Sequence, residues 1–373
     1  MKNNILFLTL RVFGATGGIE KVCRVAGKSI FEMTLPGSST AKIFCMHDHQ
    51  VDADGNKYFP TQIFRGFGGA KIKFLYSVIK KCRAYDTVIL SHINLISIGW
   101  LIKKVSPGTK IVMFAHGIEV WGMMSDRKKK LMKCCDHIIP VSHFTSTKMQ
   151  ELHHFPATKC TVLNNCMDPF LPAIPGENET KRLRAAYGYK ETDKLLFTLS
   201  RLSSQEKYKG YDKVMEAMPL LKEKFPGIRY LLAGGYDKEE KKYVEALAEK
   251  LGLKDDVKIT GFIPEEDLAA HFSIADVYVM PSLQEGFGIV FIEAMYYGIP
   301  VIAGNRDGSV DALCNGRLGI LADPLDVIAI GDSIEKVLAN RNAFVPNREL
   351  LMEAFDYENY KKKLETILEK VRA

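Results

Sequence analysis

The sequence predicts an α/β protein made of two Rossmann-like, doubly wound domains that face a central cleft. Three observations lead to this prediction. Short runs of β-branched and aliphatic residues alternate with longer amphipathic segments, which is typical of βαβ units with parallel sheets. Many of these runs are apolar throughout, as strands covered on both faces require. The alternation lapses once, between about residues 168 and 192, where three prolines and a polar stretch indicate a link between two domains.

The predicted strands form two sets, one on each side of this link. The first set is 4–10, 41–46, 87–91, 110–115, 137–141 and 160–163. The second set is 195–200, 229–233, 257–260, 276–280, 300–303 and 318–321. We therefore expect one domain over 1–168, a linker over 169–192 and a second domain over 193–345. The tail, 346–373, is predicted as a last helix that packs across the junction.

Composition places the chain among soluble globular proteins. Its 373 residues are 47% hydrophobic and 25% charged, which is enough for two domains with sizeable cores. The apolar run near the N-terminus meets Arg11 and is too short for a signal peptide, and no other stretch approaches the roughly 18 apolar residues of a membrane span. The eight cysteines form no C-x-x-C pair, so we expect core thiols and a cytoplasmic location.

Positive charge is concentrated in the first half of the chain. Residues 1–170 hold 23 Lys and Arg against 11 Asp and Glu, whereas the remainder holds 28 against 33. The amphipathic segment "AKIKFLYSVIKKCR" contributes Lys71, Lys73, Lys80, Lys81 and Arg83. Such a face is either simply solvated or suits an anionic membrane surface, which leaves peripheral membrane attachment open. We expect no nucleic acid as a partner, because no recognised nucleic-acid module is present.

Two acidic residues in "EGFGIVFIEAMYYGIP", residues 285–300, need polar partners. Glu285 is predicted on a loop between a strand and a helix, and Glu293 falls among large apolar side chains, where an unpaired carboxylate would be costly. If both were helical, they would stand about 12 Å apart, too far to act on one bond as a glycosidase pair. A helix N-terminus flanked by two acids instead suits a ligand with hydroxyls at both ends and phosphates between them, such as a nucleotide sugar.

The spacing of Glu285 and Glu293 resembles the E-x7-E signature of the retaining family-4, or group 1, glycosyltransferases of the GT-B fold. The flanking "TGFIPEEDLAAHFSIADVYVMPS" and "AGNRDGSVDALCNGRLGILADP" are similar to that family too, so the resemblance covers most of residues 195–340. It implies an acceptor-side first domain and a nucleotide-sugar-binding second domain. It also implies that Glu285 holds donor sugar hydroxyls and that Glu293 holds ribose hydroxyls. The resemblance further implies that the diphosphate is bound by the backbone N–H groups of Phe287, Gly288 and Ile289. Gly286 lies in the same turn.

The leaving diphosphate of such a reaction carries negative charge that must be stabilised. The loop "LSRLSSQEKYKGYDKV" resembles the family's Arg followed by Lys-Gly, with Arg201 and Lys209 as the implied catalytic cations, and it leaves the neighbouring Lys207 unresolved. Three further residues match family segments that line the nucleotide: Gly234, Phe262 and Ile263. Solvated loop charges and ordinary turns are the alternatives left open.

The first domain contributes a glycine-rich turn and a histidine. In "GATGGIEKV", Gly17 and Gly18 stand where a strand meets a helix, and glycine there lets backbone approach phosphate closely. The resemblance implies that this turn faces the diphosphate. His116 in "FAHGIEVWG" follows a predicted strand and matches the family's active-site histidine, which contacts the donor sugar. A tight turn and a structural histidine are the open alternatives.

We expect neither a metal nor a cofactor. Asp52 and Asp54 spell the D-x-D metal motif of the other glycosyltransferase fold, but the Asp-Gly-Asn that begins at Asp54 is more typical of a polar turn. The "HDH" at 47–49 and the "HH" at 153–154 lack further ligands at suitable spacing. The two loop cations would take the place of a divalent ion.

The resulting expectation is a retaining, metal-independent glycosyltransferase. Its donor would be a UDP-, GDP- or ADP-sugar, and its acceptor a glycan or a lipid-linked sugar, in the synthesis of cell-surface polysaccharide or lipopolysaccharide. Two alternatives stay open, namely a nucleotide-sugar epimerase of the same fold and a non-catalytic binding module.

Overall fold

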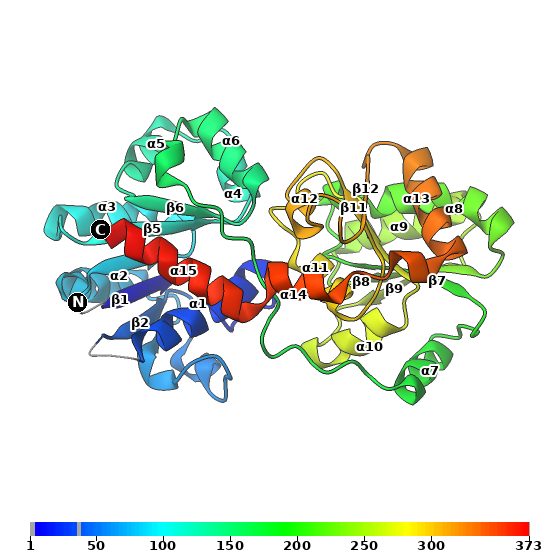
Figure 1. The fold of residues 1–373 in the computed structure, drawn as a ribbon, viewed down its shortest axis with the longest axis horizontal. Helices are drawn as coiled ribbons and strands as arrows, with labels where there is room; N and C mark the ends of the chain where they lie inside the picture. The colour runs from blue at the N-terminus through cyan, green and yellow to red at the C-terminus, as the bar shows by residue number, and fades with distance from the viewer. Residues whose placement is uncertain (1–3, 36–38, 373) are drawn as a thin grey trace. The chain divides into compact units, whose positions relative to one another are not determined.

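The computed structural model describes residues 4–35 and 39–372 and divides the chain into two compact units (Figure 1). Unit 1 holds the residues up to Phe170 together with those from Tyr357 onward. Unit 2 holds Leu171–Asp356. Each unit contains one six-stranded sheet in which all neighbouring strands are parallel, so the structure confirms the predicted α/β class.

The sheet of unit 1 has the strand order β3-β2-β1-β4-β5-β6. Its strands are β1 (Ile5–Thr9), β2 (Ala41–Cys45), β3 (Phe64–Gly66), β4 (Thr87–Leu90), β5 (Lys110–Ala115) and β6 (His137–Pro140). The order reverses direction between β1 and β4, as in a doubly wound nucleotide-binding fold. The sequence missed β3, because three residues carry too little pattern. The predicted strand at 160–163 is wrong, since the chain there makes only the isolated bridge between Ile138 and Cys160.

Helices cover both faces of this sheet. They are α1 (Gly18–Thr34), α2 (Lys71–Lys81), α3 (Ile96–Val105), α4 (Ile118–Trp121), α5 (Asp126–Met132), α6 (His143–His153) and α15 (Tyr357–Arg372). Alternate side chains of β1 enter different cores, as the two-residue period of a strand requires. Phe7 packs in one core with residues of α1 and α15, whereas Leu8 packs in the other core with residues of α2 and α3. This double burial accounts for the uninterrupted apolar strands.

The sheet of unit 2 has the order β12-β11-β10-β7-β8-β9, which repeats the topology of unit 1. Its strands are β7 (Lys194–Leu199), β8 (Ile228–Ala233), β9 (Val257–Gly261), β10 (Val277–Met280), β11 (Val301–Gly304) and β12 (Ile320–Ala322). Its helices are α7 (Glu177–Ala186), α8 (Tyr211–Lys224), α9 (Lys238–Lys250), α10 (Leu268–Ser273), α11 (Ile289–Tyr296), α12 (Ser309–Ala312), α13 (Val327–Ala339) and α14 (Arg348–Phe355). Here the order reverses between β7 and β10.

Two segments outside the predicted domains differ from expectation. The segment 169–192, expected to be a linker, contains α7, which is attached to unit 2: Arg184 donates to the carbonyl oxygens of Ile274 (2.8 Å) and Asp193 (2.7 Å). The tail 346–373, expected to be one helix, is two helices, because the backbone of Asp356 is extended and ends α14.

These two helices belong to different units. In unit 2, Phe355 at the end of α14 packs edge-on against Phe287 with 5.6 Å between ring centroids. In unit 1, Tyr357 at the start of α15 donates to the Glu32 carboxylate of α1 at 2.8 Å. In Figure 1 the red α15 lies with the N-terminal elements.

Within residues 4–35 and 39–372, no helix combines the length and the apolar character needed to cross a bilayer. The eight cysteines are free thiols, and five of them are buried. Burial raises the pKa of Cys45 to about 12, so this thiol stays protonated as a small core residue.

Candidate active site

The residues predicted for the second domain lie on segments that follow strands of the unit 2 sheet, and two of them, Lys209 and Glu285, are in contact. Lys209 lies in a short 3-10 helix, Lys207–Lys209, on the connection that follows β7. Glu285 lies on the connection that follows β10. Because β7 and β10 are neighbours at the point where the strand order reverses, their connections lie where proteins of this topology usually bind their ligands.

Lys209 and Glu285 form the central contact of this edge. The Lys209 ammonium donates to the Glu285 carboxylate, and each side chain is only 14% exposed. Burial alone would lower the pKa of Lys209, but the attraction and hydrogen bond of Glu285 outweigh it, so the pKa of Lys209 is raised. The lysine therefore stays cationic across the physiological range.

The glycine after Lys209 allows the Lys209 loop to pack closely against the loop that follows β10. Gly210 has a φ of 77°, and a Cβ at this position would lie 2.3 Å from the carbonyl oxygen of Pro281. Next to it, the N–H of Leu283 donates to the carbonyl oxygen of Tyr208 at 2.9 Å. The glycine of the Lys-Gly pair is thus required for the two loops to pack together.

The other two cations of the loop point elsewhere. Lys207 lies 3.8 Å from a carboxylate oxygen of Glu240 and 3.8 Å above the ring of Tyr243. Arg201 is exposed and pairs with Glu206 at 3.2 Å. Lys209 thus reaches Glu285, whereas Lys207 contacts Glu240, and the assignment of Lys209 to a phosphate stays a prediction.

The segment after Glu285 leads into α11. Phe287 is buried, so the predicted role of this residue can only be carried by its backbone. Gly288 caps α11 with a φ of 83°, and a Cβ there would lie 2.4 Å from the ring of Phe291. The first N–H groups of a helix have no acceptor within it, and the binding of a diphosphate by the turn of Gly286, Phe287, Gly288 and Ile289 stays a prediction. Glu293 is buried on α11.

The ends of β8 and β9 place the remaining predicted residues. A Cβ at Gly234 would lie 1.9 Å from the carbonyl oxygen of Ser200. The close packing of these two backbone segments is therefore enough to require glycine at position 234. Its N–H donates to the carbonyl oxygen of Gly261 at 2.8 Å. The ring of Phe262 is exposed to solvent. The side chain of Ile263 is buried in the core.

In unit 1, His116 follows β5 and is nearly buried. Its Nε2 lies 2.7 Å from the carbonyl oxygen of Ser91, which follows β4, and its backbone N–H donates to Glu119 at 2.5 Å. The next residue, Gly117, has a φ of 151°. The ring is therefore held against the carboxyl edge of the sheet through one nitrogen.

Gly17 and Gly18 begin α1. A Cβ at Gly17 would lie 2.4 Å from a carboxylate oxygen of Glu20, whereas a Cβ at Gly18 would meet nothing within 4 Å. The protein's own packing therefore does not account for glycine at position 18. Open space beside a helix N-terminus is compatible with a close-lying anion.

Buried aspartates that the sequence analysis missed hold the loops of both units. Asp48, after β2, accepts the N–H groups of Val12 and Phe13 in the loop after β1, each at 2.8 Å. Asp307, after β11, accepts the N–H of Glu285 at 2.7 Å. The available signal was the position of each residue, three places beyond the end of a buried strand.

The D-x-D stretch has a local structural role. Asp52 accepts the N–H of His49 at 2.8 Å and so caps the short 3-10 helix Gln50–Ala53. Among the described residues, no group of three or more His, Cys, Asp or Glu side chains is placed to hold a metal ion.

Two family models match the chain. The model described as "Glycosyl transferases group 1" matches residues 179–362, and the model described as "Glycosyltransferase Family 4" matches residues 38–169. The repeated Rossmann-like sheets and the site at the reversal of strand order define an α/β protein of the GT-B fold. The chain belongs to the group 1, family-4 glycosyltransferases.

One curated relative is the GDP-mannose-dependent alpha-(1-6)-phosphatidylinositol monomannoside mannosyltransferase of Mycolicibacterium smegmatis, 30% identical over 249 residues. The match covers 62% of this chain and 61%, less than two thirds, of that relative. Among solved structures, HepE of Anabaena in complex with UDP and glucose has a TM-score of 0.80 at 18% identity, over 99% of this chain and 100% of that chain. Sucrose-phosphate synthase of Thermosynechococcus elongatus has a TM-score of 0.78 at 20% identity, over 99% of each chain.

Proposed function

We propose that this protein is a retaining glycosyltransferase that moves a sugar from a nucleoside-diphospho-sugar to a glycan or lipid-linked acceptor. The observation that carries the proposal is the partly buried pair of Lys209 and Glu285 where the loops after β7 and β10 meet. A cation and an acid at this edge suit a ligand in which phosphate and sugar hydroxyls are adjacent. Family membership supports the same reading.

The proposed roles follow from charge and position. Lys209, with Arg201, stabilises the negative charge that develops on the leaving diphosphate, and the N-terminal turn of α11 adds its N–H groups. Glu285 accepts hydrogen bonds from the donor sugar. When the donor binds, the direct ion pair between Lys209 and Glu285 would be replaced by two contacts, from Lys209 to the diphosphate and from Glu285 to the sugar. Glu293 holds the ribose, and the nucleotide is lined by Gly234, Phe262 and Ile263.

In unit 1, we assign His116 to the donor sugar and the turn of Gly17 and Gly18 to the diphosphate. No covalent nucleophile is assigned, so the acceptor is proposed to attack from the face that the leaving phosphate occupies. The retained anomeric configuration of the product is the measurable consequence. Nuclear magnetic resonance of the transferred sugar would show it directly.

The donor is proposed to be a UDP-, GDP- or ADP-sugar. HepE was solved with UDP and glucose, and the mycobacterial relative is named for GDP-mannose, so uridine and guanosine sugars are the first to test. A thermal-shift screen identifies the base, because a ligand that binds the folded state raises the melting temperature. No response to any nucleoside diphosphate or its sugars would count against the proposal.

Reaction needs no metal or other cofactor under this proposal, because Lys209 and Arg201 supply positive charge at the diphosphate. We predict that transfer persists in excess chelator. The measurement is the initial rate of donor consumption before and after dialysis against chelator. A strict requirement for added magnesium or manganese would instead show that the two side chains are insufficient.

The exposed face of α2 supports a membrane-associated acceptor. Ile72 and Tyr76 are 85% and 65% exposed on this helix. Four lysines of the helix flank them, namely Lys71, Lys73, Lys80 and Lys81. Exposed apolar side chains among lysines suit an anionic bilayer surface. We therefore propose peripheral attachment at the cytoplasmic face, with an acceptor in cell-surface polysaccharide or lipopolysaccharide synthesis.

The decisive test is Glu285→Gln. Turnover should fall by about two orders of magnitude or more, because the amide no longer offers a full charge to orient the donor. Retained melting temperature and far-ultraviolet circular dichroism serve as the folding control. Normal transfer by a folded variant would remove Glu285 from the site, and an epimerised donor without any acceptor product would favour an epimerase.

A further inference from the structure

Asp307 is a buried carboxylate that none of the proposed chemical steps uses. It follows β11 and is 1% exposed. One of its oxygens accepts the Ser282 hydroxyl at 2.8 Å and the backbone N–H of Glu285 at 2.7 Å. The other oxygen accepts the N–H of Ser309 at 2.9 Å. Both oxygens are thus occupied, and two of the three bonds go to the loop that carries Glu285.

The same two loops are locked by close backbone contacts. The N–H of Gly308 donates to the carbonyl oxygen of Glu285 at 2.8 Å, so both peptide groups of Glu285 have partners on the loop after β11. A Cβ at Gly308 would lie 2.1 Å from the carbonyl oxygen of Gly286. A Cβ at Gly304 would lie 2.0 Å from the carbonyl oxygen of Ser282. Little room remains for the Glu285 loop to move.

We propose that Asp307 is a positioning residue that fixes the backbone of Glu285, and thereby the direction in which its carboxylate meets Lys209 and the donor sugar. This inference rests on the proposed function of Glu285. The carboxylate is suited to the task because it accepts several N–H and O–H donors at once, and such charge-assisted bonds are short and strong. An amide in its place would accept with one atom only and present donors where acceptors are needed.

The charge state of Asp307 gives the proposal a pH signature. Burial, with a contribution from the negative charge of Glu285, raises the pKa of Asp307 to about 6. The ionisable side chain that faces it is Glu285, while Ser282 and Ser309 are neutral donors. Above this pH the carboxylate accepts all three bonds. Below it, the added proton displaces one donor, so the loop should loosen as the solution is acidified.

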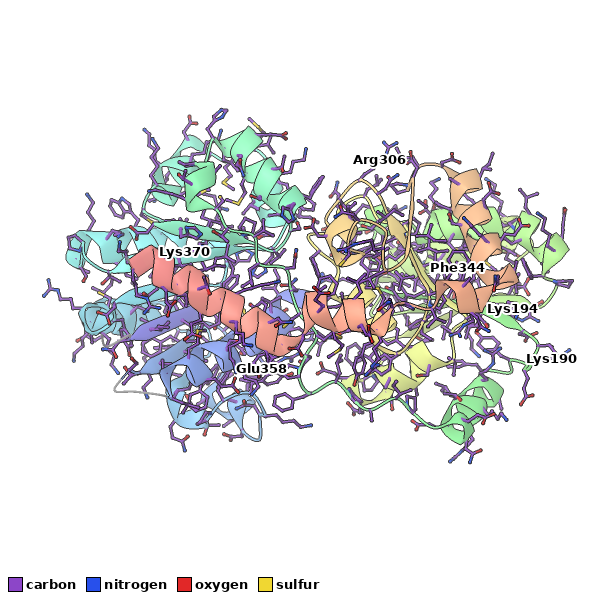
Figure 2. All side chains as sticks on the ribbon, in the orientation of Figure 1. Lys190, Lys194, Arg306, Phe344, Glu358 and Lys370 are labelled. Carbon is purple, nitrogen blue, oxygen red and sulfur yellow. The ribbon has the colours of Figure 1, made fainter. Side chains whose placement is uncertain are left out.

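Asp193 provides a matched control in the same unit. It is also a buried carboxylate that accepts a backbone N–H, that of Lys190 at 2.9 Å, but it stands at the start of β7, the opposite edge of the sheet. Lys190 and Lys194, labelled in Figure 2, flank it in the chain. Arg306, also labelled there, precedes Asp307 and pairs with Asp323.

The experiment compares Asp307→Asn with Asp193→Asn. Hydrogen exchange of the segment 282–289, measured by mass spectrometry, should be at least tenfold faster in Asp307→Asn and unchanged in Asp193→Asn. Donor turnover should fall about 10- to 100-fold in Asp307→Asn alone, since small misplacement of a reacting group has effects of this size. Exchange and turnover that match the wild type, or an equal loss in both variants, would overturn the proposal.

Acid titration of the wild type needs no variant and covers the case in which Asp307→Asn does not fold. Protection of 282–289, corrected for intrinsic exchange, should decrease as the pH is lowered, with a midpoint near 6. Protection that stays constant through this range would contradict the proposal. The exchange data decide the role of Asp307 even if no nucleotide sugar is turned over. Failure of the Asp307 proposal can therefore be told apart from failure of the proposed function.

Discussion

At the residue scale, the site depends on which of several similar side chains points toward the edge of the sheet. Two lysines stand two positions apart in the same short 3-10 helix, yet Lys209 contacts Glu285 and Lys207 contacts Glu240. Their different surroundings follow from the turn of the helix and from Gly210, which brings only the end of the segment against the loop after β10. A matched pair of variants therefore isolates the proposed catalytic charge.

We predict that Lys209→Gln lowers donor turnover by about 100- to 1,000-fold, the usual effect of removing one group that stabilises a developing charge. Lys207→Gln should change turnover by no more than about twofold, because its contacts lie outside the proposed site and surface substitutions have small effects. Steady-state kinetics with one donor at saturation tests both. Equal losses of turnover in the two variants would mean that the loop acts through its total positive charge and not through Lys209 in particular.

At the element scale, the sequence predicted the strands of the two sheets well and the connections less well. Strands such as β1 and β10 are buried along their whole length and are mostly apolar, because both faces of the sheet are covered, and this signal is local. The short β3, the helix α7 inside a polar stretch and the break at Asp356 are decided by contacts with distant residues, which a local pattern does not contain.

The same distinction applies to the site. Glu285, Lys209 and His116 were predicted from motifs, whereas Asp307 and Asp48 were missed because their partners are backbone N–H groups of other loops. The sequence shows only that each aspartate follows a buried strand, and it does not show which N–H groups the carboxylate accepts. These bonds become visible only when strand order places the two loops side by side.

The junction of the loops after β7 and β10 gives a prediction about stability. Gly210→Ala should destabilise unit 2 by about 1 to 3 kcal/mol, because alanine is strained at positive φ and its Cβ would meet the carbonyl oxygen of Pro281. Gly235→Ala is the control, since a Cβ there meets nothing within 4 Å and its φ is not positive. Chemical denaturation of both variants measures the difference, and equal midpoints would show that the loops yield without strain.

At the scale of the whole molecule, charge divides unevenly along the chain. Residues 1–170 carry 23 basic against 11 acidic side chains, whereas the rest of the chain carries 28 against 33. The helix α2 concentrates this excess beside the exposed Ile72 and Tyr76. An uneven charge distribution of this kind matters for association with surfaces and not for folding. It is therefore the feature on which the proposed attachment to a membrane surface rests.

We predict that the wild type binds vesicles containing anionic lipid at low salt and leaves them as salt is added, because exposed charges are screened over about 10 Å at 0.1 M. Each basic side chain near the bilayer contributes roughly 1 kcal/mol. The test variant changes five residues to Gln: Lys71, Lys73, Lys80, Lys81 and Arg83. It should no longer bind vesicles in a flotation assay, while donor hydrolysis or transfer to a soluble acceptor stays near the wild-type rate.

A second variant controls for net charge. It changes five lysines of unit 2 to Gln, within and just after α9: Lys238, Lys241, Lys242, Lys250 and Lys254. If the face of α2 docks the protein, this variant binds anionic vesicles as the wild type does, although its total charge equals that of the first variant. Equal release of both variants would trace binding to overall charge. A wild type that ignores anionic vesicles even at low salt would make α2 a solvated face and point to a soluble acceptor.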